Sequence, residues 1–211
     1  FMTLSKILGD TNAFKIRIAD LDGYDRVDKS DAFFYNFDAE KDIASDTAKL
    51  PNALKTDGVE LFSIRDSYDP KEAKFYFSTH FGITSGYHTH NDTGTFVLDM
   101  LGKRFAEDLG SENYNLENEL GYKQTDIYRK RAEGHNVIVL NPDKDFNQTG
   151  GLFVPITKYA SNENGGYVVT DMQGVYKDTT RMKLGYYIDD NMNSLTMRNE
   201  FSTAKKSTAY W

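Results

Sequence analysis

The sequence predicts an all-β protein, an antiparallel β-sandwich of the supersandwich type, preceded by a short irregular or partly helical segment. Three observations favour this class. Short apolar or alternating segments recur between turn residues along most of the chain. The 211 residues include 14 Tyr and 14 Phe, and aromatic residues are enriched in strands. Only 4 residues are Pro, while Asn, Asp and Gly, which form turns, are common.

The N-terminal quarter differs from the rest of the chain. Residues 1–57 are acidic and irregular, with possible short helices near 2–8 and 38–49, and they end in a stretch suited to a linker. We therefore separate this segment from a β-sandwich domain over 58–211. Both ends of the chain look cut. The chain starts with FMTLSKILGD, which resembles a cut end, and its last residues, KKSTAYW, stop inside a strand-like pattern. We expect the chain to be a fragment of a longer protein.

Strand signals begin after this segment. VELFSIR and KFYFSTHF alternate between apolar and polar residues, whereas NVIVL is a short apolar run typical of a buried strand. Turn residues separate each such segment from the next. In order, the predicted strands are 59–65, 74–81, 95–100, 104–108, 136–140, 151–159, 167–171, 185–189 and 194–201.

Charge and composition exclude several classes of function. The formal net charge is −7, whereas a nucleic-acid-binding protein normally carries a basic surface. No run of about 18 apolar residues is present, so the sequence predicts no membrane span. With no cysteine, a metal ion would have to be held by His, Asp, Glu or water.

Two of the four histidines stand together in the stretch GITSGYHTHNDTGTF. If this stretch is extended, His88 and His90 project from one face, about 7 Å apart. Their small and polar neighbours make a role in the core a poor explanation. His80 differs, because it alternates with polar residues on a predicted strand, and we interpret it as an ordinary histidine on the polar face.

A metal site requires further ligands. Asp108, at the end of a predicted strand, and His135, just before another, are the best candidates. Together with His90 they form a set of two histidines and one aspartate. Such a set suits Zn²⁺ or a similar divalent ion, with water or another ligand in the fourth position.

A basic run lies close to His135 in the sequence. Lys123, Arg129 and Arg131 would attract an anionic sugar chain against the acidic background, although an ordinary solvated run explains each of them equally well. Tyr128 adjoins this run and is a candidate acid or substrate contact.

Two quoted stretches carry a resemblance to a known family. SGYHTHNDTGTFVLDMLGKRFAEDLGSENY, followed by IYRKRAEGHNVIVLNP, resembles the C-terminal β-domain of the heparinase II/III-like polysaccharide lyases, over about residues 58–142. The resemblance implies that His90, Asp108 and His135 hold a metal ion, usually zinc, and that His88 faces the substrate. It also implies an N-terminal helical toroid domain as a partner in the same protein, of which residues 1–57 would be the last turn and the connector.

The resemblance implies a function as part of a lyase that cleaves uronic-acid-containing polysaccharides by β-elimination. This chemistry needs a base for the C5 proton, an acid for the leaving oxygen at C4 and a group that neutralises the adjacent carboxylate. We assign His88 and Tyr128 to this neighbourhood. Because the toroid would supply further catalytic groups, we expect the isolated chain to be inactive.

Two other interpretations remain open. The chain is also compatible with a non-catalytic carbohydrate-binding sandwich, which would bind an acidic polysaccharide without cleaving it. A cupin-like metalloenzyme is the third, because GITSGYHTH matches the opening of the cupin metal motif. That motif requires a Glu four or five residues after the second histidine, where this chain has Gly94 and Thr95.

Overall fold

The computed structural model describes most of the chain after the N-terminal segment. The described residues are 51–67, 72–84, 89–118, 120–121, 123, 126–142 and 147–211. The predicted helices near 2–8 and 38–49 therefore lie outside the described residues. So does most of the predicted segment 1–57, of which only residues 51–57 are described. Within the described part, no helix is long and apolar enough to cross a membrane.

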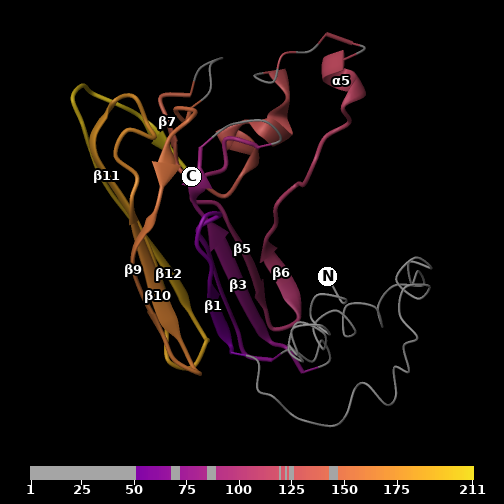
Figure 1. Ribbon diagram of the computed structural model, residues 1–211, viewed down its shortest axis with the longest axis vertical. Helices are drawn as coiled ribbons and strands as arrows, with labels where there is room; N and C mark the ends of the chain where they lie inside the picture. The colour runs from indigo at the N-terminus through magenta and orange to yellow at the C-terminus, as the bar shows by residue number, and fades with distance from the viewer. Residues whose placement is uncertain are drawn as a thin grey trace, which may run out of the picture. The chain divides into compact units, whose positions relative to one another are not determined.

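Two antiparallel sheets form the two layers of a sandwich (Figure 1). The first has the strand order β1-β2-β3-β5-β6 and the second the order β12-β11-β10-β9. The first sheet consists of β1 (Ala53–Lys55), β2 (Leu61–Arg65), β3 (Phe75–His80), β5 (Phe96–Met100) and β6 (Lys103–Ala106). The second consists of β9 (Ile156–Ser161), β10 (Gly166–Asp171), β11 (Thr179–Ile188) and β12 (Leu195–Thr203).

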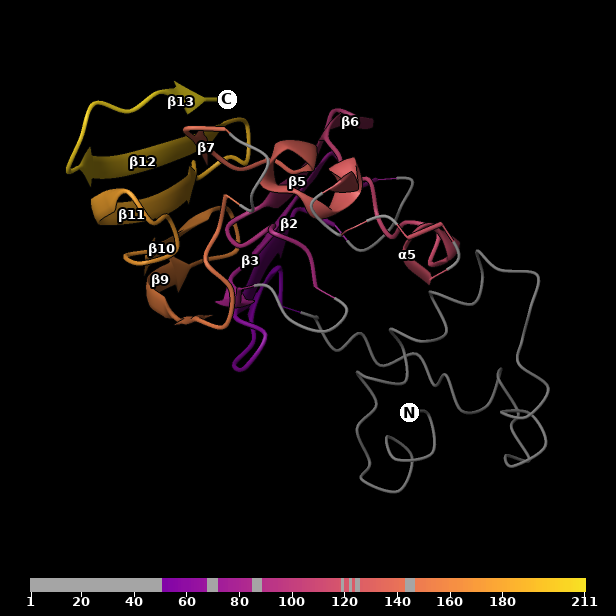
Figure 2. The same ribbon diagram turned by 90° about the horizontal axis from the view of Figure 1, so that it is seen from above.

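Shorter elements join and close these layers. β4 (Gly82–Ile83) pairs with β8 (Phe153–Val154), and β13 (Ala209–Tyr210) pairs with β7 (Val139–Leu140). A short helix, α5 (Asn115–Asn118), and two 3-10 turns, η2 (Tyr128–Lys130) and η3 (Ala132–Gly134), lie in the connection between β6 and β7 (Figure 2). This connection carries several of the candidate site residues.

The core lies between the two sheets and follows the alternation of the strands. Every second residue of β2, β3 and β11 points inward, as the two-residue period of a strand requires. Buried side chains from both sheets form one cluster, which includes Phe62, Ile64, Phe75, Phe77, Val168, Met182, Leu184, Tyr186 and Ile188. The structure thus confirms the predicted all-β antiparallel sandwich.

The strands agree with the sequence-based expectation in position more than in length. Each predicted strand overlaps an observed one, and the segment predicted at 151–159 divides into β8 and β9. The strand predicted at 185–189 is the end of the much longer β11. The first sheet also begins at Ala53, ahead of residue 58, because β1 pairs with β2.

Candidate functional site

Residues 89–95 run without regular secondary structure between β4 and β5, and their backbone is held from several sides. The Asn91 N–H donates to the Lys130 carbonyl at 3.0 Å. The Thr93 N–H donates to Gln148 Oε1, and Gln148 Nε2 donates back to the Thr93 carbonyl, each at 3.0 Å. A segment whose backbone is held at alternate residues presents the side chains at and beside those residues in a defined direction. His90 and Asp92 lie in this segment.

Gly94 makes the close approach of this segment to the core possible. Its φ is +87°, in the left-handed region that favours glycine, and an added Cβ would lie 2.8 Å from Leu184 Cδ2. Its N–H donates to the His80 carbonyl at 2.9 Å. The Tyr186 hydroxyl donates to its carbonyl at 2.6 Å. The glycine therefore joins the site segment to both sheets.

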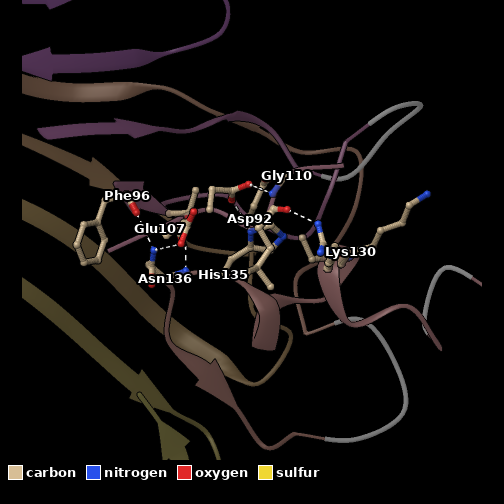
Figure 3. A network of polar contacts seen from close by, with 12 residues as sticks. Asp92, Phe96, Glu107, Gly110, Lys130, His135 and Asn136 are labelled. Atoms are coloured by element: carbon tan, nitrogen blue, oxygen red, sulfur yellow. Dashed lines mark hydrogen bonds and ion pairs between the residues drawn. The ribbon is translucent and has the colours of Figure 1, made fainter. Parts of the chain in front are cut away.

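Asn136 draws three parts of the site together (Figure 3). Its N–H donates to Thr95 Oγ1 at 3.1 Å, and its Nδ2 donates to the carbonyls of Phe96 at 2.9 Å and Glu107 at 3.0 Å. Asn136 thus links the start of β5, the end of the β5–β6 hairpin and the turn that follows η3. These three segments carry the residues His90, Asp108 and His135.

The structure brings His90, Asp92 and His135 into one cluster. One potential ligand atom of each residue lies within 4.8 Å of those of the other two. The ring centroids of His90 and His135 are 5.2 Å apart. Two imidazoles and one carboxylate at this separation form a donor set that suits a divalent transition-metal ion.

His135 presents its two ring nitrogens to different surroundings. Nδ1 lies 2.9 Å from Asp108 Oδ2, and because an ionised carboxylate only accepts hydrogen bonds, Nδ1 carries the proton. Nε2 then bears the lone pair. This atom is buried and has no hydrogen-bond partner among the described residues. A buried acceptor without a partner is unfavourable, and a metal ion bound at Nε2 would satisfy it.

The charges around the cluster favour ligand-competent protonation states. Burial, together with the neighbouring His135, lowers the pKa of His90 and keeps its imidazole neutral near pH 7. Burial alone would raise the pKa of Asp108, but hydrogen bonds from the Gly110 N–H and from His135 outweigh it, so the pKa is lowered. Metal ligands must be deprotonated, and both groups meet that requirement.

Asp108 lies beside His135 but on the side of Nδ1. It accepts the hydrogen bond from His135 and a second one, at 2.8 Å, from the Gly110 N–H. A carboxylate that orients a ligating histidine through its other nitrogen is a common arrangement around protein metal sites. Asp92 is the carboxylate of the cluster, whereas Asp108 holds Nδ1 of His135 through a hydrogen bond and leaves Nε2 without a partner among the described residues.

The predicted catalytic and substrate-binding residues have varied surroundings. His88 lies outside the described residues. The side chain of Tyr128 is 59% exposed at the start of η2, and Lys123 is exposed. Arg129 donates to the Leu109 carbonyl at 2.5 Å and lies 3.4 Å from Glu112. Arg131 is paired with Glu133, so both arginines contact protein groups.

Sequence reasoning did not select two members of this neighbourhood, Asp92 and His80. His80 Nε2 lies 3.4 Å from Asp92 Oδ2. Burial opposes the protonation of His80, but the hydrogen bond and charge of Asp92 outweigh it and raise the pKa of the histidine. The spacing of Asp92, two residues after His90, was the available signal, since residues two apart on an extended segment share one face.

Comparisons with known proteins give a likeness in structure. No family model matches the chain, and no curated protein matches it. Among solved structures, a heparan sulfate lyase, HepC, from Pedobacter heparinus has a TM-score of 0.59 at 16% identity, over 90% of this chain and 28% of that chain. A heparinase III gene product has a TM-score of 0.57 at 18% identity, over 75% of this chain and 23% of that chain. A second structure of heparinase III has a TM-score of 0.55, also at 18% identity.

At this level of identity the likeness establishes the fold. The chain has the β-sandwich fold found in heparinase III and heparan sulfate lyase structures, and it spans about a quarter of the length of those proteins. The relationship to polysaccharide lyases is thus one of fold, and the cluster of His90, Asp92 and His135 lies within that fold.

Proposed function

We propose that the chain is part of a polysaccharide lyase that cleaves uronic-acid-containing polysaccharides, of the glycosaminoglycan or alginate type, by β-elimination. The single observation that carries the proposal is the cluster of His90, Asp92 and His135 in a sandwich that shares its fold with heparan sulfate lyases. The buried, unpartnered Nε2 of His135 supports a site built for a ligand rather than a packed polar core.

We further propose that the cluster holds one divalent metal ion, most suitably Zn²⁺. His90 and His135 would bind it with a carboxylate, either Asp108, as the sequence resemblance implies, or Asp92, as the cluster indicates. The chain has no cysteine, and the donors present, imidazole and carboxylate, fit zinc. When bound, the ion would supply positive charge and rigidity to the segment that follows His88.

The remaining chemistry belongs to groups beside the cluster. His88 stands two residues before His90, and a rigid His90 would constrain the direction in which His88 faces. In the proposed reaction His88 and Tyr128 serve the acid–base chemistry and the neutralisation of the uronate carboxylate, which makes the C5 proton more acidic. The exposure of Tyr128 leaves its hydroxyl accessible to a substrate.

Substrate attraction is proposed for Lys123, Arg129 and Arg131. Arg129 also has a structural role, because its contacts with Leu109 and Glu112 tie η2 to the turn after Asp108. An anionic substrate would compete with Glu112 and Glu133 for the two guanidinium groups. The helical toroid domain remains part of the proposal as the partner that completes the cleft.

The test compares the 211-residue chain with a longer protein in which it is joined to its toroid domain. Heparan sulfate, chondroitin, hyaluronan and alginate are offered separately, and the ultraviolet absorbance of the unsaturated uronate product is recorded. We expect product from one of these polymers with the longer protein and none with the chain alone. Binding without product in the longer protein would favour the non-catalytic carbohydrate-binding sandwich.

Two variants of the longer protein locate the chemistry. His88→Ala and Tyr128→Phe are each expected to lower turnover by about a hundredfold or more, as the loss of a proton-transfer group does. Metal content should be unchanged in both, because neither residue belongs to the proposed ligand set. If His88→Ala releases the metal, both histidines are ligands and His88 is not the substrate-facing residue.

A further inference from the structure

The four-stranded sheet has a second face, which points away from the core. Along β10 and β11, Val168, Leu184 and Tyr186 are buried, so the residues between them point outward. Figure 1 shows this sheet as one layer of the sandwich, with β9 to β12 beside one another. No residue of the His90 cluster belongs to this sheet.

Two exposed tyrosines lie on this outer face, near the start of β10 and the end of β11. Tyr167 on β10 is the direct cross-strand partner of Tyr187 on β11, and their side chains are 38% and 49% exposed. Directly opposed residues on neighbouring strands have Cβ atoms about 5 Å apart. The next outward pair is Val169 and Gly185, and the glycine has no side chain to rise beside the rings. The two rings and their hydroxyl groups therefore form the aromatic part of this face.

The charges on this face oppose those of the chain as a whole. Its outward positions include four cationic side chains and two carboxylates, so positive charge is in excess on this face. The whole chain, by contrast, has a net charge of −7. Glu200 pairs with Arg181 at 2.8 Å and with Arg198 at 2.6 Å. The charged residues are Lys158, Arg181, Lys183, Arg198, Asp171 and Glu200.

Lys158 and Lys183 are the two lysines of this face, and Lys183 is the direct cross-strand neighbour of Asp171 and Glu200. Within the described part of the chain, neither ammonium group has an ion-pair partner. Lys158 is opposite Val169, in the outward row next to Tyr167, and Lys183 lies on the strand of Tyr187, four residues before it. Both lysines are exposed.

We propose that this outer face is a second binding site, which holds a strand of anionic polysaccharide outside the catalytic region. The rings of Tyr167 and Tyr187 would cover the apolar C–H faces of sugar rings, and Lys158 and Lys183 would pair with carboxylate or sulfate groups. The site would keep a long polymer close to the chain between encounters with the cleft. It shares with the proposed function only the class of ligand.

Titration calorimetry of the 211-residue chain with heparan sulfate oligosaccharides tests this site. We expect the double variant Tyr167→Ala/Tyr187→Ala to bind about tenfold more weakly or worse, because it loses the ring stacking. A tenfold change in Kd corresponds to about 1.4 kcal/mol of binding free energy. Lys158→Ala/Lys183→Ala should weaken binding and reduce its salt dependence, because fewer counterions are exchanged. Tyr167→Phe/Tyr187→Phe should retain most of the affinity, since the rings remain.

Matched controls separate this face from other exposed groups and from the candidate cleft. Tyr210→Ala and Lys103→Ala remove an exposed tyrosine and an exposed lysine elsewhere and should leave the affinity unchanged. The test measures binding to the 211-residue chain, so a failed lyase assay does not bear on it. Unchanged affinity in the double alanine variants, or equal affinity for neutral dextran, would overturn the proposal. So would a loss of self-association in those variants, measured by sedimentation, without any effect on heparan sulfate binding.

Discussion

His135 illustrates how one side chain can divide its roles between two atoms. Its Nδ1 donates to Asp108, and its Nε2 is buried without a partner among the described residues. Asp92, in turn, is held by His80 and lies within ligand distance of the cluster. Because Nδ1 is engaged by Asp108, Nε2 is the atom of His135 that would bind an ion, and single substitutions of the two carboxylates test which of them the ion needs.

The metal prediction is made at this scale. Elemental analysis of the purified chain should give about one zinc per molecule, and His90→Ala, Asp108→Ala and His135→Ala should each lose it. Asp92→Asn is the discriminating variant, and we expect it to lower zinc affinity at least 10- to 100-fold, roughly the effect of disturbing a ligand or the group that orients one. Asp99→Asn, which removes a carboxylate from β5, is the matched control. Wild-type zinc affinity in Asp92→Asn would mean that Asp92 is not a ligand and would favour the set of His90, Asp108 and His135.

At the scale of elements, η2 and η3 form a compact connection that presents Tyr128 and positions His135. Gly134 is required there, because a Cβ at this position would clash with the Tyr128 carbonyl. Arg131, between the two turns, donates to Glu133 at 2.5 and 3.1 Å, a bidentate pair within one short segment. Burial alone would raise the pKa of Glu133, but the hydrogen bond from Arg131 outweighs it and the pKa is lowered.

The ion pair of Arg131 and Glu133 predicts a contribution to the free energy of unfolding that depends on pH. A carboxyl group with a lowered pKa in the folded state stabilises the protein above its unfolded-state pKa, and this contribution disappears as the pH falls through the folded-state value. Glu133→Gln should therefore lower the free energy of unfolding by about 1 kcal/mol at neutral pH. Urea unfolding should show this difference shrinking below about pH 4. The exposed Glu163→Gln should show neither effect, and a difference that persists in acid would contradict the ion-pair explanation.

At the scale of the whole molecule, buried hydroxyl groups from β11 and from the connection between β10 and β11 hold the site segments. The Tyr186 hydroxyl donates to the Gly94 carbonyl at 2.6 Å, and the Tyr176 hydroxyl donates to the Ile138 carbonyl at 2.7 Å. Burial raises the pKa of both tyrosines, so they remain protonated donors. The sheet that carries no member of the His90 cluster thus positions the loops that do.

This coupling predicts a contrast between two neighbouring tyrosines. Tyr186→Phe leaves the Gly94 carbonyl without its donor in the core and should lower the free energy of unfolding by about 1–3 kcal/mol. Tyr187→Phe, on the exposed face of the same strand, should change it by less than about 0.5 kcal/mol. Thermal unfolding of the two variants beside the wild type measures the contrast. Equal effects would mean that the hydrogen bond to Gly94 adds nothing to stability.

Local patterns in the sequence were sufficient to predict the fold class and the positions of most strands along the chain. The alternation in VELFSIR and KFYFSTHF predicts β2 and β3 because each residue's face depends only on the two-residue period of a strand. The proximity of His90, Asp108 and His135 was predicted from their motifs. The full length of β11 was not, since its outward half is polar and its strand character comes from pairing with β10 and β12.

Only the tertiary structure decided which groups meet. Asp92 was not among the predicted site residues, and the structure places it in the cluster with His90 and His135, between the ties at Asn91 and Thr93. Arg129 looked like a free surface cation, but folding brings it to Glu112 and the Leu109 carbonyl. The sequence by itself determined the all-β class and the candidate donor residues, because these follow from local periodicity and residue chemistry. The geometry of the site required the structure, because contacts between residues distant in sequence depend on the packing of the two sheets.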